Sequence, residues 1–187
     1  MYPIISAVCL GIALSACCGF RVFLPLLGAS VAAYFGWVPL NPEMQWMAGL
    51  PAIISFGTAA VLEVLAYYIP FVDNLLDAIA TPLAVVAGTV LAASFLPLGG
   101  MDPLLRWGLG LIAGGGTAGI IQAGTGFLRL LSTKTTAGTG NAVLATGENL
   151  AAAGGTIASL LVPVLAAVLT IGLVVYLVVA LIKRLPK

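Results

Sequence analysis

Residues 15–28 read SACCGFRVFLPLLG, and this stretch decides the fold. Its one charged residue, Arg21, lies in an apolar segment that carries no other charge before Glu43. A charged side chain at the centre of a membrane helix costs at least ~2.5 kcal/mol, so it faces protein or water and has a partner there. The same stretch contains Gly19 and Pro25, which both weaken a helix. We therefore predict a membrane helix that breaks close to a buried arginine.

The composition of the whole chain places most of its surface in lipid. Of 187 residues, 61% are hydrophobic and only 7% are charged, whereas a soluble domain has about 25% charged residues. The net charge of +1 and the lack of a basic motif argue against a nucleic-acid partner. The chain has no histidine, and its three cysteines lie in an apolar run that favours packing over a disulfide or zinc site. We therefore expect an integral membrane protein that is not an enzyme and has no cofactor or metal.

Uncharged intervals divide the chain into about five hydrophobic regions. A helix needs about 20 residues to cross a ~30 Å hydrocarbon core, and lipid tolerates no unpaired backbone groups. We therefore predict an all-α, polytopic membrane protein whose hydrophobic regions are residues 3–36, 50–68, 73–96, 103–131 and 148–182. The first, fourth and fifth regions are too long for one straight crossing, which predicts broken or kinked helices. We place breaks at Gly19, Pro25, Gly115 and Gly126, and candidate kinks of the last region at Gly154-Gly155 and Pro163.

The two halves of the chain resemble each other. Residues 15–21 are similar to residues 122–129, each with an arginine just past a Gly-Phe pair, and residues 73–75 are similar to residues 148–150. Three crossings between the halves would give them opposite directions, which is the inverted-repeat plan of many transporters. The alternative is chance similarity in a sequence rich in Ala, Gly and Leu. We predict one compact membrane domain made of residues 1–97, with three hydrophobic regions, and residues 98–187, with two.

Several short motifs of the first half belong together. They are GIALSA at 11–16, GFRVFLPL at 19–26, FGWV at 35–38, Glu63, the pattern Ile69-Pro70-x-Val72-Asp73-x-x-Leu76-Asp77, and Thr81-Pro82. Together they resemble a bacterial family of multi-span membrane proteins, the domain of unknown function four-one-two-six. In the second half, Asn141 lacks the following proline that family members often have, and Glu148-Asn149 has one acid in place of two. The resemblance implies a multi-pass protein of the bacterial cytoplasmic membrane and brings no activity with it.

Charges and small residues near the ends of the regions suggest the orientation and the contacts of the protein. Lys183, Arg184 and Lys187 place the C-terminus in the cytoplasm by the positive-inside tendency. Besides the lipid bilayer, we expect a small ion or solute as partner and homo-oligomer contacts through small-residue helix faces. Such faces are Gly110-x-x-x-Gly114 and Ala151-x-x-x-Gly155.

The candidate site consists of polar side chains that apolar neighbours force toward the membrane. Arginines beside glycine breaks suit an anionic group, whereas the acids suit a cation or a proton. Alternatively, the same side chains form structural ion pairs, for example Arg21 with Asp73 or Asp77. The candidates for a substrate path or for ion pairs are Arg21, Arg129, Glu63, Asp73, Asp77, Glu148, Asn149 and Gln122.

Two functional hypotheses follow from these residues. The first is a small membrane transporter or channel for an unidentified solute or ion, with a preference for an anion. The second is a non-transporting scaffold or assembly protein whose intramembrane ion pairs are structural. A third hypothesis, an intramembrane enzyme acting on lipid, needs two or more catalytic groups in one pocket, and the chain has neither a nucleophile elbow nor a phosphate-binding loop.

Overall fold

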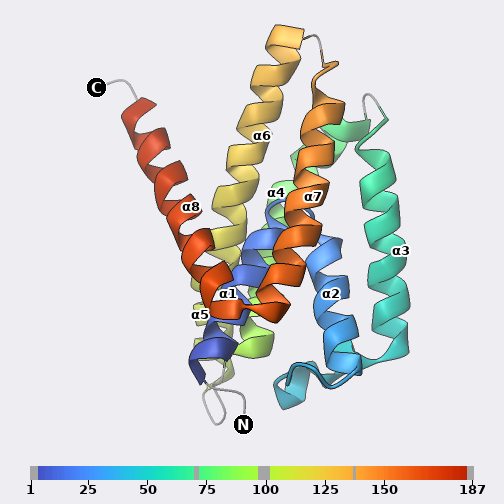
Figure 1. The fold of residues 1–187 in the computed structure, drawn as a ribbon, viewed down its shortest axis with the longest axis vertical. Coiled ribbons are helices and arrows are strands. Elements are labelled where there is room, and N and C mark those ends of the chain that lie inside the picture. The colour runs from blue at the N-terminus through green and yellow to red at the C-terminus, as the bar shows by residue number, and fades with distance from the viewer. Residues whose placement is uncertain (1–3, 70–71, 97–101, 137, 185–187) are drawn as a thin grey trace.

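The computed structural model describes residues 4–69, 72–96, 102–136 and 138–184 (Figure 1). All regular structure in these residues is helical, so the all-α prediction is confirmed. The elements are α1 (Ile4–Cys18), α2 (Phe23–Tyr34), the 3-10 helix η1 (Pro42–Ala48), α3 (Leu50–Ala66), α4 (Val72–Phe95), α5 (Pro103–Gly110), the π-helix η2 (Leu111–Gly115), α6 (Gly116–Thr136), α7 (Asn141–Leu161) and α8 (Pro163–Arg184).

Several of these helices are suited to a membrane. Among the described residues, the segments Leu75–Phe95, Pro103–Thr136 and Pro163–Ala180 are long and apolar enough to cross it. A fourth span results if η1 and α3, which meet at 63°, are counted as one. Helices α1 and α2 are apolar but shorter than a crossing. The chain is therefore a helical protein embedded in a membrane.

Helices α1 and α2 form a hairpin, which we call the re-entrant pair because it begins and ends at the same end of the molecule. In Figure 1, α1 rises from the lower end of the molecule to its middle, and α2 descends from there to the same end. Between them, at residues 19–22, the backbone turns, and the N–H group of Gly19 donates to the carbonyl of Ala16. A Cβ on Gly19 would stand 2.6 Å from the carbonyl oxygen of Ala118 on α6, so only glycine fits. The first hydrophobic region therefore turns back beside its arginine.

The other three expected breaks do not interrupt their helices. Pro25 lies in the first turn of α2, where N–H groups have no partner within the helix and proline is tolerated. Gly115 closes the π-helical segment η2, which distorts the helical run Pro103–Thr136 without ending it. Gly126 lies inside α6. Glycine costs a helix only about 1 kcal/mol, which packing against neighbouring helices can offset.

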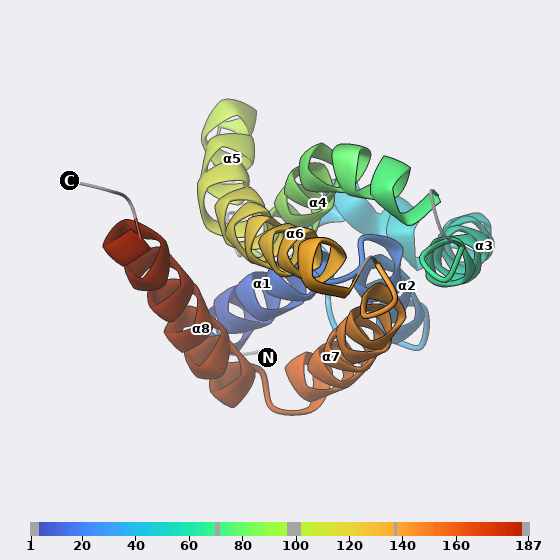
Figure 2. The same cartoon turned by 90° about the horizontal axis from the view of Figure 1, so that it is seen from above.

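The last hydrophobic region is two helices and not one kinked helix. Helix α7 begins at Asn141, well before the expected start at Glu148, and α8 returns in the opposite direction from Pro163 (Figures 1 and 2). Proline suits the first position of α8, because the N–H group there has no partner within the helix. The interval between the fourth and fifth predicted regions, residues 132–147, is largely helical, because α6 continues to Thr136 and α7 begins at Asn141. The expected kink at Gly154-Gly155 lies within α7.

Helix α1 is the core of the bundle. It packs against α4, α6, α7 and α8, and Figure 2 shows it among these helices. Its neighbours approach closely through small residues, since a Cβ on Gly114 of η2 would overlap the carbonyl oxygen of Gly88 on α4. Gly155 of α7 likewise faces Cys17 of α1. Both small-residue motifs thus pack helices within the chain, and the homo-oligomer stays a prediction.

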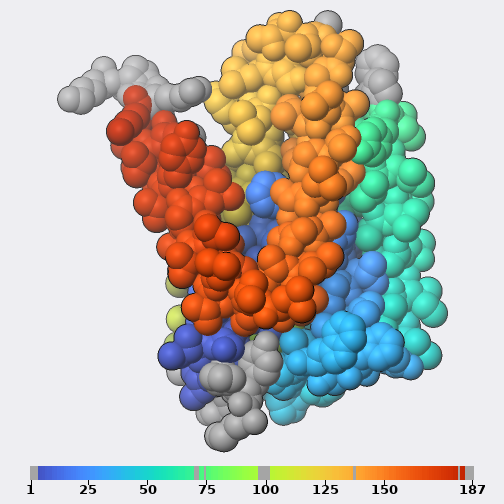
Figure 3. All heavy atoms as spheres, viewed as in Figure 1, coloured from blue at the N-terminus to red at the C-terminus, as the bar shows by residue number. Residues whose placement is uncertain are grey.

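The upper part of α8 diverges from α6, as the space-filling view in Figure 3 shows. A cavity of about 540 Å³ lies between α8, α6 and α4, and its wall includes Thr81, Gly119, Ala123 and Val178. This groove is lined almost entirely by apolar side chains. It extends the lipid-facing surface between the helices.

The predicted inverted repeat stays a prediction. Residues 15–21 end α1 and enter the break, whereas residues 122–129 lie inside α6. Residues 73–75 lie in the first turn of α4, whereas residues 148–150 lie inside α7. The similar motifs therefore differ in local structure. Several sequence predictions fall on residues outside the described ranges: the boundary of the repeats at 97–98, residue 70 of the family pattern, residue 3 at the start of the first region, and the terminal Lys187.

Candidate functional site

Two buried arginines share one carboxylate at the tip of the re-entrant pair. Arg21 lies in the break after α1, Arg129 lies on α6, and Glu148 of α7 binds both. Arg21 Nη1 is 2.8 Å from Glu148 Oε2, and Arg129 Nε is 3.1 Å from Glu148 Oε1. Arg129 Nη2 also pairs with Glu148 Oε2. The exposed fractions of Arg21, Arg129 and Glu148 are 1%, 3% and 8%, so these charges are shielded from lipid.

Every nitrogen of the Arg21 guanidinium has an acceptor. Nε donates to Asn149 Oδ1 at 2.5 Å, Nη2 to the carbonyl of Ala145 at 3.1 Å, and Nη1 to the carbonyl of Phe20 at 3.0 Å and to Glu148. The sequence-based pairing of Arg21 with Asp73 or Asp77 is therefore wrong. Its partners come from α7, because the turn after α1 places Arg21 against the middle of that helix.

The ring of Tyr67 lies against both arginines. The Arg21 Cζ atom is 4.0 Å from the ring centroid, and the Arg129 Cζ atom is 4.2 Å from it. A guanidinium at this distance from an aromatic ring is attracted to it by a cation–π interaction. Sequence reasoning missed Tyr67. Its position four residues after Glu63, on the same face of α3, was the available signal.

Two aspartates of α4 reach the cluster from another side. Asp77 Oδ1 lies 3.7 Å from Arg129 Nη1, so Arg129 and not Arg21 is its cationic partner. Asp73, in the first turn of α4, accepts a hydrogen bond from Asn141 Nδ2 at 3.2 Å. Asn141 is the first residue of α7, and its Nδ2 also donates to Thr133 Oγ1 on α6. These contacts join the upper ends of α4, α6 and α7.

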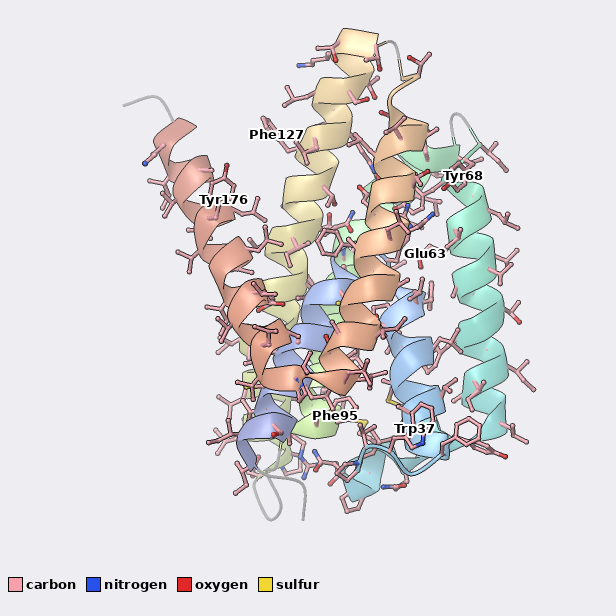
Figure 4. All side chains as sticks on the ribbon, in the orientation of Figure 1. Trp37, Glu63, Tyr68, Phe95, Phe127 and Tyr176 are labelled. Atoms are coloured by element: carbon pink, nitrogen blue, oxygen red, sulfur yellow. The ribbon has the colours of Figure 1, made fainter. Side chains whose placement is uncertain are left out.

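Glu63 binds the N-terminus of α2. Its Oε1 accepts from the N–H group of Val22 at 2.8 Å, and its Oε2 accepts from that of Phe23 at 3.0 Å. The residue before α2, Val22, has no capping side chain of its own. The first N–H groups of a helix need partners, most of all where lipid replaces water. A carboxylate of α3 (Figure 4) therefore supplies the cap that the re-entrant helix lacks.

A cavity of about 300 Å³ lies beside this cap, between α2, α3 and α4. Its wall includes Val22, Phe23, Glu63 and Tyr67, together with apolar residues of α4 such as Leu76. The cavity thus meets the charged cluster at Glu63 and Tyr67. On this side, the cluster borders a cavity and is not covered by a neighbouring helix.

The outer edge of the cluster is a small hydrogen-bond network. Asn149 Nδ2 donates to Tyr68 Oη at 3.2 Å, and Tyr68 Oη lies 2.9 Å from Thr146 Oγ1. Tyr68, labelled in Figure 4, lies just beyond the end of α3. Gln122 is buried on α6, about 10 Å along the helix axis from Arg129, and is therefore not part of this cluster.

The structure brings together all the candidate residues except Gln122, and the cluster contains two arginines and four acids. Glu63 and Asp73 lie at the N-termini of α2 and α4, where the positive end of the helix dipole offsets a carboxylate. Two arginines then face the two remaining acids, Asp77 and Glu148. The described residues contain no group of three or more metal-ligating side chains. Chemically, the centre of the cluster is a pair of guanidinium groups that holds the carboxylate of Glu148.

A comparison with models of known protein families identifies the family of this chain. A family model described as a domain of unknown function (DUF4126) matches residues 8–183, so the chain belongs to this family. No curated protein and no solved structure matches it.

Proposed function

We propose that this DUF4126 protein is a membrane transporter or channel for a small anion. The observation that carries the proposal is the carboxylate of Glu148, held by Arg21 and Arg129 at the tip of a re-entrant helix pair. Glu148 occupies the position that the anionic group of a substrate would take. Discontinuous helices that end inside the membrane are a common way to build such a site.

The cost of the cluster supports a functional role. Each arginine at membrane depth costs at least ~2.5 kcal/mol, and two of them side by side also repel each other. Replacing a buried ion triad by well-packed apolar side chains is often neutral or stabilising. A fold selected only for stability would therefore gain little from this cluster. A site that binds and releases an anion needs it.

The cavity beside Glu63 and Tyr67 offers a way to reach the arginines. It is lined by Val22 and Phe23 at the N-terminus of α2 and by Tyr67 of the cluster. Movement of the Glu148 side chain, or of the α1–α2 tip, would open the guanidinium groups to this space.

We further propose that the protein lies in the bacterial cytoplasmic membrane with the end of α8 on the cytoplasmic side, as the terminal cations favour.

The second candidate function is a non-transporting scaffold, and one observation favours it. Arg21 is 1% exposed and has an acceptor for each of its nitrogens, which is how a purely structural arginine is held. Under this alternative, the cluster fixes the re-entrant pair in the bundle. It then has no reason to exchange Glu148 for an external anion.

Flux into proteoliposomes tests the proposal against this alternative. The purified protein is reconstituted, and uptake of a panel of anions, cations and neutral solutes is measured. We expect uptake of at least one small anion, with a loss of about tenfold or more in Arg129→Ala and Arg21→Ala. Lys134→Ala, at an exposed position of α6, is the control variant. Arg129→Lys, which keeps the charge, covers the case in which Arg129→Ala does not fold. Anion uptake that is absent from the wild type, or unchanged in all three arginine variants, would contradict the proposal.

A further inference from the structure

The cavity of about 300 Å³ between α2, α3 and α4 is a crevice that faces the lipid. At the upper end of the molecule α3 ends and α4 begins, and the two helices diverge below it (Figures 1 and 2). The α4 wall of the crevice lies within a membrane span and consists of Leu76, Ile79, Ala80 and Leu83. Ile79 and Leu83 are 47% and 39% exposed, so this wall is open to the surrounding lipid.

The crevice has one polar end and one apolar end. Along α3 it extends from Tyr67 to Ala59, about 12 Å along the helix axis. At the first end, the Tyr67 ring also lies against the guanidinium groups of Arg21 and Arg129. At the other end, Ala59 and Leu83 lie near the middle of their helices. A molecule that fills the crevice therefore has its polar part at the cluster and its apolar part toward the middle of the bilayer.

The walls of the crevice suit a hydrocarbon chain. Apart from Glu63 and Tyr67, every lining side chain is apolar. The Glu63 carboxylate accepts from the N–H groups of Val22 and Phe23, and the N-terminus of α2 offsets its charge. An inorganic ion in this space would give up its hydration without polar groups to replace it, which is costly. An apolar chain loses nothing there, because it leaves lipid for another apolar surface.

We infer that the transported anion is amphiphilic, with an anionic head such as a carboxylate or a sulfonate on one apolar chain. The chain occupies the crevice. The head binds Arg21 and Arg129 in place of Glu148, once the movement described above has opened them to this space. Glu148 is itself a carboxylate at the end of a short apolar chain, so it has the chemistry of the head that it replaces. This inference rests on the proposed anion transport and names its substrate class.

Ala59 is then a specificity-determining residue. It lines the crevice at the apolar end and is only partly buried. A leucine at this position would fill space that the far end of the chain needs, while the arginine pair at the opposite end keeps its contacts. The length of the chain, and not the charge of the head, is therefore what Ala59 controls.

The test measures how uptake by the reconstituted protein depends on chain length. Alkanesulfonates serve as probes, because they stay charged and cross a protein-free bilayer slowly. The apparent KM is measured for methanesulfonate, butanesulfonate and octanesulfonate, with protein-free vesicles as blank and chloride for comparison. We expect the apparent KM to fall by about tenfold or more from methanesulfonate to octanesulfonate, because more of the chain is removed from water.

A pair of variants separates the crevice from simple partition of the probe into lipid. In Ala59→Leu we expect the advantage of octanesulfonate over methanesulfonate to shrink by about tenfold, because the filled crevice no longer holds the longer chain. Ala78→Leu is the control. It makes the same change at an exposed position of α4 outside the walls of the crevice, and it should keep the wild-type advantage.

The outcomes distinguish this inference from the proposed function. If no anion enters, the proposed function itself is wrong. If methanesulfonate and chloride enter as readily as octanesulfonate, transport stands and the amphiphilic substrate class is overturned. An advantage of octanesulfonate that is equal in Ala59→Leu and Ala78→Leu would overturn the role of the crevice. Should Ala59→Leu not fold, the dependence of the wild type on chain length still decides the substrate class.

An anionic phospholipid also joins a charged head to apolar chains. Uptake of octanesulfonate is therefore compared in phosphatidylcholine vesicles with and without phosphatidylglycerol. Uptake that phosphatidylglycerol leaves unchanged would assign the crevice to a free anion with a single chain, as we expect. Strong inhibition would assign the crevice to the phospholipid and overturn the single-chain class.

Discussion

Arg21 and Glu148 lie 127 residues apart in the sequence, yet they form a buried ion pair with Nη1 and Oε2 2.8 Å apart. The pair ties the turn between α1 and α2 to the middle of α7. The same carboxylate also binds Arg129 on α6. One side chain therefore holds three separate parts of the bundle together, and its removal has consequences for both stability and binding.

Substitution Glu148→Gln should destabilise the protein strongly. It keeps the shape of the side chain but leaves two buried guanidinium groups without their shared charge. Breaking a buried pair in this way costs about 3–5 kcal/mol. Unfolding in detergent by a chemical denaturant measures the change. Glu43→Gln is the control, because the Glu43 side chain that pairs with Arg106 is 56% exposed, and we expect a loss of at most about 1 kcal/mol there. Equal losses at the two sites would contradict the central role of Glu148.

Substitution Glu63→Ala should loosen the start of α2. It leaves the N–H groups of Val22 and Phe23 without acceptors, at a cost of about 1–3 kcal/mol for each buried group. Hydrogen exchange of these two amides should become faster, while amides in the middle of α4 keep their rates. Glu63→Gln, which retains one strong acceptor, should fall between the wild type and Glu63→Ala. Unchanged exchange at Val22 and Phe23 would show that the carboxylate is not their cap.

Substitution of Tyr67 should separate the role of its ring from that of its hydroxyl. Tyr67→Leu removes the aromatic face on which both guanidinium groups lie, and about 0.5–2 kcal/mol per arginine is expected to be lost. Tyr67→Phe keeps the face and should cost clearly less. Thermal unfolding of the two variants in the same detergent makes the comparison. A larger loss in Tyr67→Phe than in Tyr67→Leu would assign the stabilisation to the hydroxyl instead.

Alanine at two glycines of the long helical run should have opposite effects. A Cβ on Gly114 would overlap the Gly88 carbonyl of α4, so Gly114→Ala must push two helices apart and lower stability. A Cβ on Gly126 would meet no atom within 4 Å, so Gly126→Ala should be neutral or stabilise by up to about 1 kcal/mol. Both are measured by thermal unfolding. The prediction is wrong if Gly126→Ala is the more harmful change.

The sequence predicted what depends on local pattern and missed what depends on distant contacts. The long apolar runs predicted the bounds of α3 and α4 to within a few residues. A membrane helix needs a continuous run of apolar residues, and such a run is visible in the sequence itself. Gly19 and Gly126 each precede a phenylalanine in an apolar run, but only Gly19 lies at a break. The difference is the close approach of α6 to Gly19, which no local pattern records.

The candidate site shows the same division. Composition alone marked Arg21 as a charge that needs a partner, but it did not choose among the acids. Glu148 resembled the start of a helix, since an acid often opens one. It lies instead inside α7, where two arginines from other parts of the chain bind its carboxylate. They take the role that water has for an acid at the surface. Tyr67 carries no charge, so its place between the arginines was visible only in the structure.

The most direct test of anion binding at the arginines is rescue of Glu148→Gln by an external anion. The thermal unfolding of this variant is followed in detergent while bicarbonate is added at constant ionic strength, with the wild type in parallel. If Glu148 occupies the place of the substrate anion, bicarbonate should stabilise the variant, by about 1.4 kcal/mol for each tenfold increase above its dissociation constant. The wild type, whose site is filled by its own carboxylate, should respond much less. Equal responses of the two proteins, or no stabilisation of Glu148→Gln at any concentration, would contradict the claim that the two arginines form an anion-binding site.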